Sequence, residues 1–193
     1  MKKTFLLAMT LLALHSATAK DHANIVTSSL GGESFTLIEN KQPVSILIAD
    51  SELKGVRIAA ENLQADFERV CGAKAALNTA ASAKKCVIVG SLNSPFIQKM
   101  VKAGKLNAAD LKGKVEKYVM TVVADPVDGV EEALVIAGSD MRGTIYGIYE
   151  LSEQLGVSPW YDWMDVPVVA QENVSIAKGT YTAGEPAVRY RGL

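Results

Sequence analysis

Apolar residues recur with helical spacing in three segments of the chain. The clearest stripe lies in residues 51–70 and consists of Val56, Ala59, Ala60, Leu63, Phe67 and Val70. Gly72 predicts the end of this helix, since glycine readily adopts the left-handed conformation that often follows a helix. The pattern predicts a second helix over residues 95–103 and a third between Gly138 and Gly156.

Short continuous apolar runs between these helices predict strands. They cover residues 35–39, 44–49, 86–90, 118–124 and 133–138, with further candidates at 75–78 and 174–176. Residues 40–43 have turn composition, so we expect the first two strands to pair. Hairpins mixed with helix-connected strands indicate an α/β fold, a two-layer sandwich of one mixed β-sheet with about three helices on one face.

The first nineteen residues have the pattern of a bacterial signal peptide. Lys2 and Lys3 precede an apolar run over residues 5–14, and small residues follow at 17–19. The run is shorter than the roughly 20 residues that cross a bilayer, and no later run approaches that length. We therefore expect no membrane span and an exported protein that is periplasmic, on the cell surface or secreted.

Composition then limits the function classes. The chain has 193 residues, and the part after the predicted signal, about 174 residues, has the length of one domain. It carries 18 basic and 21 acidic side chains, a formal net charge of −3. This balance gives no electrostatic reason to bind nucleic acid.

Two cysteines and one histidine limit the redox and metal chemistry. In an exported chain Cys71 and Cys86 either form a disulfide or remain two separate buried thiols, and the sequence leaves both options open. His22 is the only histidine after the predicted signal, and it lies in a polar leader. We expect no metal site, no cofactor, and neither a Ser-His-Asp nor a Cys-His catalytic group.

The start of the third helix is a candidate anion site. Gly138-Ser139-Asp140 follows a buried strand, where free helix amides can bind an anion, but Ser139 or Asp140 can cap those amides instead. Arg142 opposes the helix dipole and so needs an acceptor. That acceptor is either Asp140 or another surface carboxylate of this domain, or a carboxylate on a neighbouring domain or acidic substrate. The four-residue spacing of Gly143 and Gly147 permits close approach of another element.

An aromatic loop follows the same helix. Trp160, Tyr161 and Trp163 can stack on sugar rings or anchor a domain interface, and we favour the interface. Asp162 and Asp165 lie on one local segment, whereas glycoside cleavage needs two carboxyl groups facing each other across a bond. We therefore assign no catalytic residue in this chain.

One long motif resembles a known family. The segment GSDMRGTIYGIYELSEQLGVSPWYDWMDVPV, together with Glu61-Asn62-Leu63 and Val87-Ile88-Val89-Gly90, resembles the N-terminal region of glycoside hydrolase family 115, the xylan α-glucuronidases. The resemblance is strongest over residues 133–168 and extends from about Phe35 to Arg191. It implies an enzyme that removes 4-O-methyl-glucuronic acid from glucuronoxylan with inversion, on a β/α barrel that follows this domain.

The resemblance also implies a domain organisation. Residues 1–19 are the signal peptide, 20–34 a flexible leader, 35–178 an α/β accessory domain, and 179–193 a linker with the start of a catalytic barrel. Related domains precede the barrels of hexosaminidases. The partner is then the barrel of the same polypeptide, which binds the polysaccharide, and the general acid and base lie on that barrel.

Three hypotheses follow from the sequence. The leading one is an accessory domain of an exported glycoside hydrolase that is inactive alone. The second is a free-standing carbohydrate-binding module that uses Trp160 and Trp163. The third is a compact hydrolase that uses Asp140, Asp162 or Asp165, and the lack of an opposing acid on a distant segment counts against it.

Overall fold

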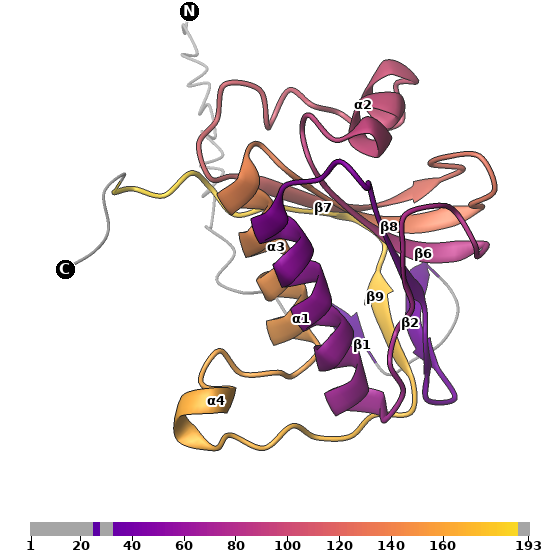
Figure 1. The fold of residues 1–193 in the computed structure, drawn as a ribbon, viewed down its shortest axis with the longest axis vertical. Helices are drawn as coiled ribbons and strands as arrows, with labels where there is room; N and C mark the ends of the chain where they lie inside the picture. Colours follow the sequence, from indigo (N-terminus) through magenta and orange to yellow (C-terminus); the bar gives the residue numbers. More distant parts are fainter. Residues whose placement is uncertain (1–24, 28–32, 189–193) are drawn as a thin grey trace, which may run out of the picture.

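The larger of two β-sheets organises the part of the chain that a computed structural model describes, residues 25–27 and 33–188 (Figure 1). Its strand order is β10-β7-β8-β6-β4-β5. The strands are β4 (Ser45–Ile48), β5 (Leu77–Asn78), β6 (Lys85–Ser91), β7 (Tyr118–Ala124), β8 (Glu132–Gly138) and β10 (Thr180–Tyr181). Neighbours from β5 to β8 run parallel, while β7 and β10 add antiparallel edges, so the sheet is mixed as predicted.

A smaller antiparallel sheet joins the two ends of the described chain. Its order is β1-β9-β2-β3, with β1 at Val26–Thr27, β2 at Ser34–Glu39, β3 at Gln42–Pro43 and β9 at Val174–Ala177. The strand β9 pairs with β1 on one side and with β2 on the other. A C-terminal strand therefore completes a sheet that begins with N-terminal strands.

The three predicted helices form close to their expected limits. They are α1 (Lys54–Cys71), α2 (Pro95–Lys102) and α3 (Met141–Gln154), and a short helix α4 (Tyr161–Met164) follows them. Gly72 ends α1 with a φ of +80°, the left-handed conformation that a glycine adopts at little cost. Helices α1 and α3 lie side by side (Figure 1).

Alternating side chains of the large sheet build two cores. On one face Val87, Val89 and Ile136 pack with α1, α3 and the small sheet. On the other face Ile88 and Val135 pack with α2 and the loop after it. The mixed α/β architecture is thus confirmed, but the expectation that all helices share one face is wrong for α2.

The same two cores separate the cysteines. Cys71 belongs to the core under α1, and Cys86 belongs to the core on the opposite face of the sheet. Both are buried and free. The disulfide that the sequence left open is not formed, because the sheet lies between the two thiols.

Three local expectations are also corrected. The expected hairpin turn at residues 40–43 forms, but it pairs β2 with the short strand β3, and the run 44–49 continues into the large sheet, where β4 pairs with β5 and β6. The expected leader contains β1, and the expected linker contains β10, which pairs with the edge of β7. The backbone amides and carbonyls of β1 and β10 form hydrogen bonds at the edges of the two sheets. The residue types in these segments did not indicate this pairing.

Several expectations fall outside the described residues. The structure does not describe the predicted signal peptide at residues 1–19 or most of the predicted leader. It also does not describe residues 189–193, the last five of the proposed barrel start. In the described ranges, none of the helices combines the length and apolar character needed to cross a bilayer.

Candidate functional site

The aromatic segment, residues 158–165, contains α4 and forms the first part of the connection from α3 to the strand β9. Trp160 is 60% exposed and Trp163 is 83% exposed. Tyr161 is half-buried against the core, and the guanidinium of Arg69 lies 4.6 Å from its ring centre. Tyr161 therefore anchors the segment while both tryptophans face solvent.

Other apolar side chains near the tryptophans are exposed as well. Met164 is 68% exposed and Val169 is 74% exposed, so four large apolar residues are uncovered within ten positions. Single exposed apolar residues are ordinary, but a concentration of them marks a surface that another molecule or domain covers. Both roles considered for the aromatic residues, a domain interface and contact with a sugar, stay predictions.

A cavity of about 280 Å³ lies beside this segment. Its walls come from α1, α3 and residues 157–162, and they include Asn62, Asp66, Ser152 and Asp162. Asp66 is buried and accepts a hydrogen bond from Arg69 at 2.5 Å. The cavity was not predicted, because its two helices lie far apart in the sequence and their pairing has no local signal.

Asp140 occupies the predicted anion site with its own carboxylate. Its Oδ1 accepts a hydrogen bond from the amide of Gly143 at 2.8 Å, and its Oδ2 accepts one from the amide of Glu116 at 2.8 Å. Ser139 Oγ accepts from the amide of Lys117 at 3.0 Å. The self-capping alternative is therefore confirmed for Asp140, which caps the helix at the amide of Gly143.

Arg142 has its acceptor inside the domain. Its Nη1 donates to Oε1 of Glu116 at 2.9 Å, and this hydrogen bond raises the pKa of the guanidinium. The Glu116 side chain is 6% exposed, whereas that of Arg142 is 64% exposed. Arg142 therefore has a structural role that requires no substrate carboxylate, and sequence reasoning missed Glu116 because it lies 26 positions away.

Gly143 and Gly147 allow the close packing that their spacing predicted. A Cβ at Gly143 would lie 2.3 Å from the carbonyl oxygen of Lys117, and one at Gly147 would lie 2.7 Å from Ile136. These contacts bring α3 against the segment before β7 and against β8. The two glycines thus serve packing within the domain.

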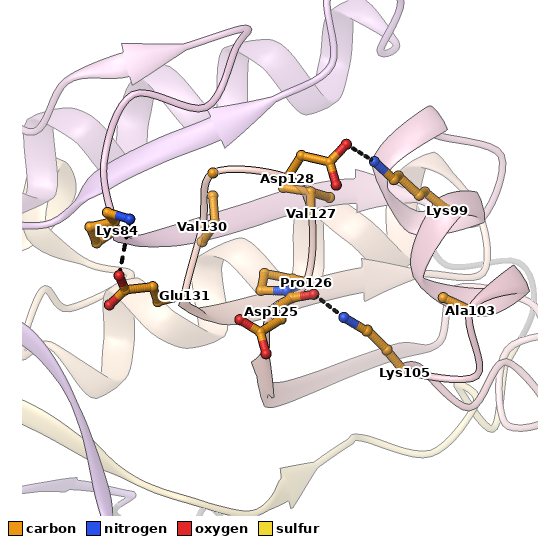
Figure 2. Close-up of a pocket in the computed structure, with 11 residues that line it drawn as sticks. Lys84, Lys99, Ala103, Lys105, Asp125, Pro126, Val127, Asp128, Val130 and Glu131 are labelled. Carbon is orange, nitrogen blue, oxygen red and sulfur yellow. Dashed lines mark hydrogen bonds and ion pairs between the residues drawn. The ribbon is translucent and has the colours of Figure 1, made fainter.

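A second depression, of about 370 Å³, surrounds the turn between β7 and β8. Figure 2 shows that its charges contact each other: Lys84 and Glu131 at 3.0 Å, Lys99 and Asp128 at 2.7 Å, and Lys105 donating to the carbonyl oxygen of Asp125. The hydrogen bond from Lys99 lowers the pKa of Asp128. Mutual pairing on an exposed surface explains these charges without a reaction.

The remaining candidates give no catalytic arrangement. Asp162 and Asp165 both belong to the short segment of α4, with Asp165 at its C-terminal end. Among the residues that the structure describes, no three His, Cys, Asp or Glu side chains gather as a metal site would require. The strongest candidate sites are therefore two: the exposed aromatic segment and the cavity beside it.

Comparison with known proteins gives one family and several structures. Residues 32–151 match the model of the family described as glycosyl hydrolase family 67 N-terminus. Among solved structures, the chain is similar to a family GH115 4-O-methyl-α-glucuronidase, BtGH115A, described as specific for decorated arabinogalactans, with 31% identity and a TM-score of 0.61. That match covers 77% of this chain and 18% of the glucuronidase.

Two further structures match less closely. CpGH84D shares 8% identity at a TM-score of 0.44, over 79% of this chain and 22% of its own. A mutant Streptomyces plicatus β-hexosaminidase shares 13% identity at a TM-score of 0.43, over 78% of this chain and 23% of its own. No curated protein matches the chain significantly.

Proposed function

The chain belongs to the glycosyl hydrolase family 67 N-terminus family, and we propose that it acts as a non-catalytic accessory domain that supports the catalytic barrel of a larger glycoside hydrolase. The family match over residues 32–151 carries this proposal. The span of the structural match, 18% of the glucuronidase, agrees with one domain of a much longer enzyme.

The side chains of the described residues support a non-catalytic role. Asp140 holds two backbone amides, and Asp162 and Asp165 lie on the same short segment. Glycoside hydrolysis needs two carboxyl groups on opposite sides of the bond, at roughly 5–9.5 Å from each other. In a barrel enzyme those groups lie at the C-terminal ends of the barrel strands.

The proposed reaction of the whole enzyme is removal of 4-O-methyl-glucuronic acid side chains with inversion. Similarity to a 4-O-methyl-α-glucuronidase at 31% identity supports this class, and a position within family GH115 is part of the proposal. We propose glucuronoxylan as the polysaccharide. Decorated arabinogalactan, named for the similar enzyme, is the comparison substrate in the test.

The test measures release of 4-O-methyl-glucuronic acid by chromatography. The protein alone is incubated with glucuronoxylan and, separately, with decorated arabinogalactan, and we expect no release from either. A polypeptide that also contains the catalytic barrel is expected to release the acid from glucuronoxylan. Turnover by the protein alone would reject the accessory role, and release from arabinogalactan only would reject the proposed substrate.

The aromatic segment is the proposed contact with the barrel. Trp163, Met164 and Val169 supply the exposed apolar area that such an interface buries. A second candidate, carbohydrate binding by Trp160 and Trp163, is favoured by the same exposure. Titration with xylan oligomers under tryptophan fluorescence separates the two, because a sugar-stacking surface responds in the protein alone whereas an interface does not.

Export is also part of the proposal, on the basis of the pattern in residues 1–19. Cleavage after Ala19 would give a mature protein that begins at Lys20. N-terminal sequencing of the protein from the producing cells tests this. A sequence that begins at Met1 would contradict export through this segment.

A further inference from the structure

Exposed apolar side chains are distributed unevenly over the described part of the chain. Five of them lie at the start of α1 or on α1 and α3, and we call the surface that they form the helix face: Leu53, Ile58, Met141, Tyr146 and Tyr149. In the residues that the structure describes, none of the large exposed apolar side chains belongs to α2, to residues 103–114 or to a strand. Such an uneven distribution marks the side on which another molecule or domain packs.

The helix face is continuous because α1 and α3 are in direct contact. A Cβ at Gly55 would lie 3.0 Å from Sδ of Met141, so the two helices meet near their first turns. Further along, Asn62 Nδ2 donates to the hydroxyl oxygen of Tyr149 at 2.7 Å. Ile58 lies between these two contacts on α1. The exposed apolar groups of the two helices therefore belong to one surface.

The aromatic segment continues the helix face beyond the end of α3. Tyr149 of the helix face and Tyr161 of the aromatic segment line the same cavity. Trp160 and Trp163, both exposed, are each next in sequence to a residue of that cavity wall. The exposed apolar surface therefore extends from the start of both helices, past the cavity, to α4.

The C-terminal segment leads to one end of the helix face. Glu185 accepts a hydrogen bond from the amide of Val115 at 2.9 Å and pairs with Lys114 at 2.9 Å. These contacts hold it beside the segment before β7, which packs against α3 at Gly143. Figure 1 shows the C-terminal segment passing the start of α3 and running away from α2. In the proposed longer polypeptide, the chain after Val188 therefore starts beside the helix face.

From these observations we propose that the catalytic barrel of the same polypeptide covers the helix face. The inference rests on the proposed accessory role, and it extends the proposed contact from the aromatic segment along both helices. A partner joined to the same chain has an effective concentration on the order of millimolar, which favours it over a second, separate copy. Exposed charges of both signs, including Lys54, Glu61 and Arg142, lie on the same helices and suit the polar rim of an interface.

The first experiment measures how fast a water-soluble maleimide labels an introduced cysteine. The native thiols of Cys71 and Cys86 are buried, so they give little background in the folded protein. Ile58→Cys lies on the helix face, and Lys102→Cys, at the exposed end of α2, is the matched control. We expect Ile58→Cys to react about tenfold more slowly in a polypeptide that also contains the barrel than in the protein alone, because an interface excludes solvent. Lys102→Cys should react at about the same rate in both.

A charge substitution provides a second, independent measurement. In the protein alone, Ile58→Asp places the carboxylate in solvent, and the melting temperature should stay within about 3 °C of the original. In the longer polypeptide the same carboxylate is buried against the barrel, and the unfolding transition of this domain should fall by about 5 °C or more. Lys102→Asp should shift the transition equally in both polypeptides, because the end of α2 stays in solvent.

The outcomes separate this inference from the proposed function. Equal labelling of Ile58→Cys in both polypeptides would overturn the inference, and release of the acid by the longer polypeptide in that case would leave the accessory role intact. Slow labelling in the protein alone, with a sedimentation mass of two copies, would assign the helix face to self-association and also overturn it. Protection of Ile58→Cys in a longer polypeptide that releases no acid would support the covered face and reject the proposed reaction.

Discussion

The requirement for glycine at position 143 arises from contact with a neighbouring backbone. A Cβ there would lie 2.3 Å from the carbonyl oxygen of Lys117 and 2.9 Å from its carbonyl carbon. Main-chain atoms cannot move aside as the end of a flexible side chain can. A methyl group at this position must therefore push α3 away from the segment before β7.

We predict that Gly143→Ala lowers the free energy of unfolding by about 2 kcal/mol, since overpacking costs more than the gain in helix propensity. Gly184→Ala is the matched control, because no atom lies within 4 Å of a Cβ at that position. It is expected to change stability by less than ~0.5 kcal/mol. Urea unfolding of both variants measures the difference, and equal stability would contradict the close contact.

Burial of Cys86 gives the protein a pH dependence in the alkaline range. Desolvation raises the pKa of its thiol from 9.0 to about 11. Between these values the unfolded thiol loses its proton while the folded thiol keeps it, so the free energy of unfolding falls as the pH rises through this window. Cys86→Ala is expected to lose this part of the decline, as urea unfolding at about pH 8 and about pH 10.5 would show.

The control for this prediction is Cys71→Ala, which removes a buried thiol from the opposite core and leaves Cys86 in place. It should retain the alkaline decline of the unsubstituted protein. An identical decline in the protein with Cys86→Ala would show that other groups cause the effect.

At the scale of residues, the sequence indicated what a side chain does more readily than which distant residue it contacts. It identified Arg142 as a cation in need of an acceptor and Asp140 as a helix cap, and both descriptions hold. It did not identify Glu116, because the partner becomes adjacent only when the segment before β7 lies against α3. The exposure of Trp160 and Trp163 likewise depends on the packing of Tyr161, which spacing does not reveal.

At the scale of elements, one carboxylate fastens the start of α3 to the segment before β7. Asp140 accepts from Gly143 within the helix and from Glu116 outside it. The ion pair between Arg142 and Glu116 lies next to these bonds. The start of the helix and the segment before the strand are therefore positioned by the same group.

We predict that Asp140→Ala lowers the free energy of unfolding by about 2 kcal/mol, because it removes the N-cap and leaves a second amide without its acceptor. Asp140→Asn keeps one acceptor oxygen and should lose about half as much. Asp162→Ala, at an exposed position in α4, serves as the control and should change stability by less than ~0.5 kcal/mol. Thermal unfolding of the three variants provides the measurement, and a neutral Asp140→Ala would refute the cap's role.

Local patterns predicted helices and central strands well but not the pairing of strands. The limits of α1, α3 and β7 follow from helical spacing, glycine and apolar runs that the chain carries locally. Residues 40–43 do form a hairpin turn, which pairs β2 with β3, but the separation of β2 from β4 into different sheets was missed because no local pattern marks where the chain leaves the small sheet. The face covered by α2 was missed for the same reason, since a helix stripe does not specify which side of a sheet it meets.

At the scale of the whole molecule, α3 separates two regions of different character. Its first turn lies against residues 116–118, near the point where the C-terminal segment is held by a hydrogen bond from the amide of Val115 to Glu185 at 2.9 Å. Its last turn leads to the aromatic segment. A helix of 14 residues is about 21 Å long, so the aromatic surface lies far from this C-terminal segment (Figure 1).

The position of the tryptophans gives a spectroscopic prediction. The whole chain contains two tryptophans, Trp160 and Trp163, so its indole fluorescence reports on the aromatic segment alone. We expect emission typical of solvated indole and efficient quenching by acrylamide. Trp160→Phe, which leaves the 83% exposed Trp163, should be quenched more readily than Trp163→Phe, which leaves the 60% exposed Trp160.

Two results would contradict this description. Blue-shifted emission that resists acrylamide in the protein alone would mean that the segment is folded inward. Unchanged quenching in a polypeptide that also contains the barrel would show that the barrel does not cover the segment. Tyr146→Phe, an exposed aromatic position on α3, is the control that should alter neither property.

The small sheet has a consequence for biosynthesis. Strand β2 is synthesised well before its neighbour β9. The separation is shown by Asn40 and Asn173, which lie next to these strands, are 133 positions apart and are joined by a hydrogen bond. At about 5–20 residues per second, the nascent chain waits on the order of ten seconds with that edge uncovered. During this interval the unpaired edge of β2 is accessible to a chaperone, and pairing with β9 then covers it.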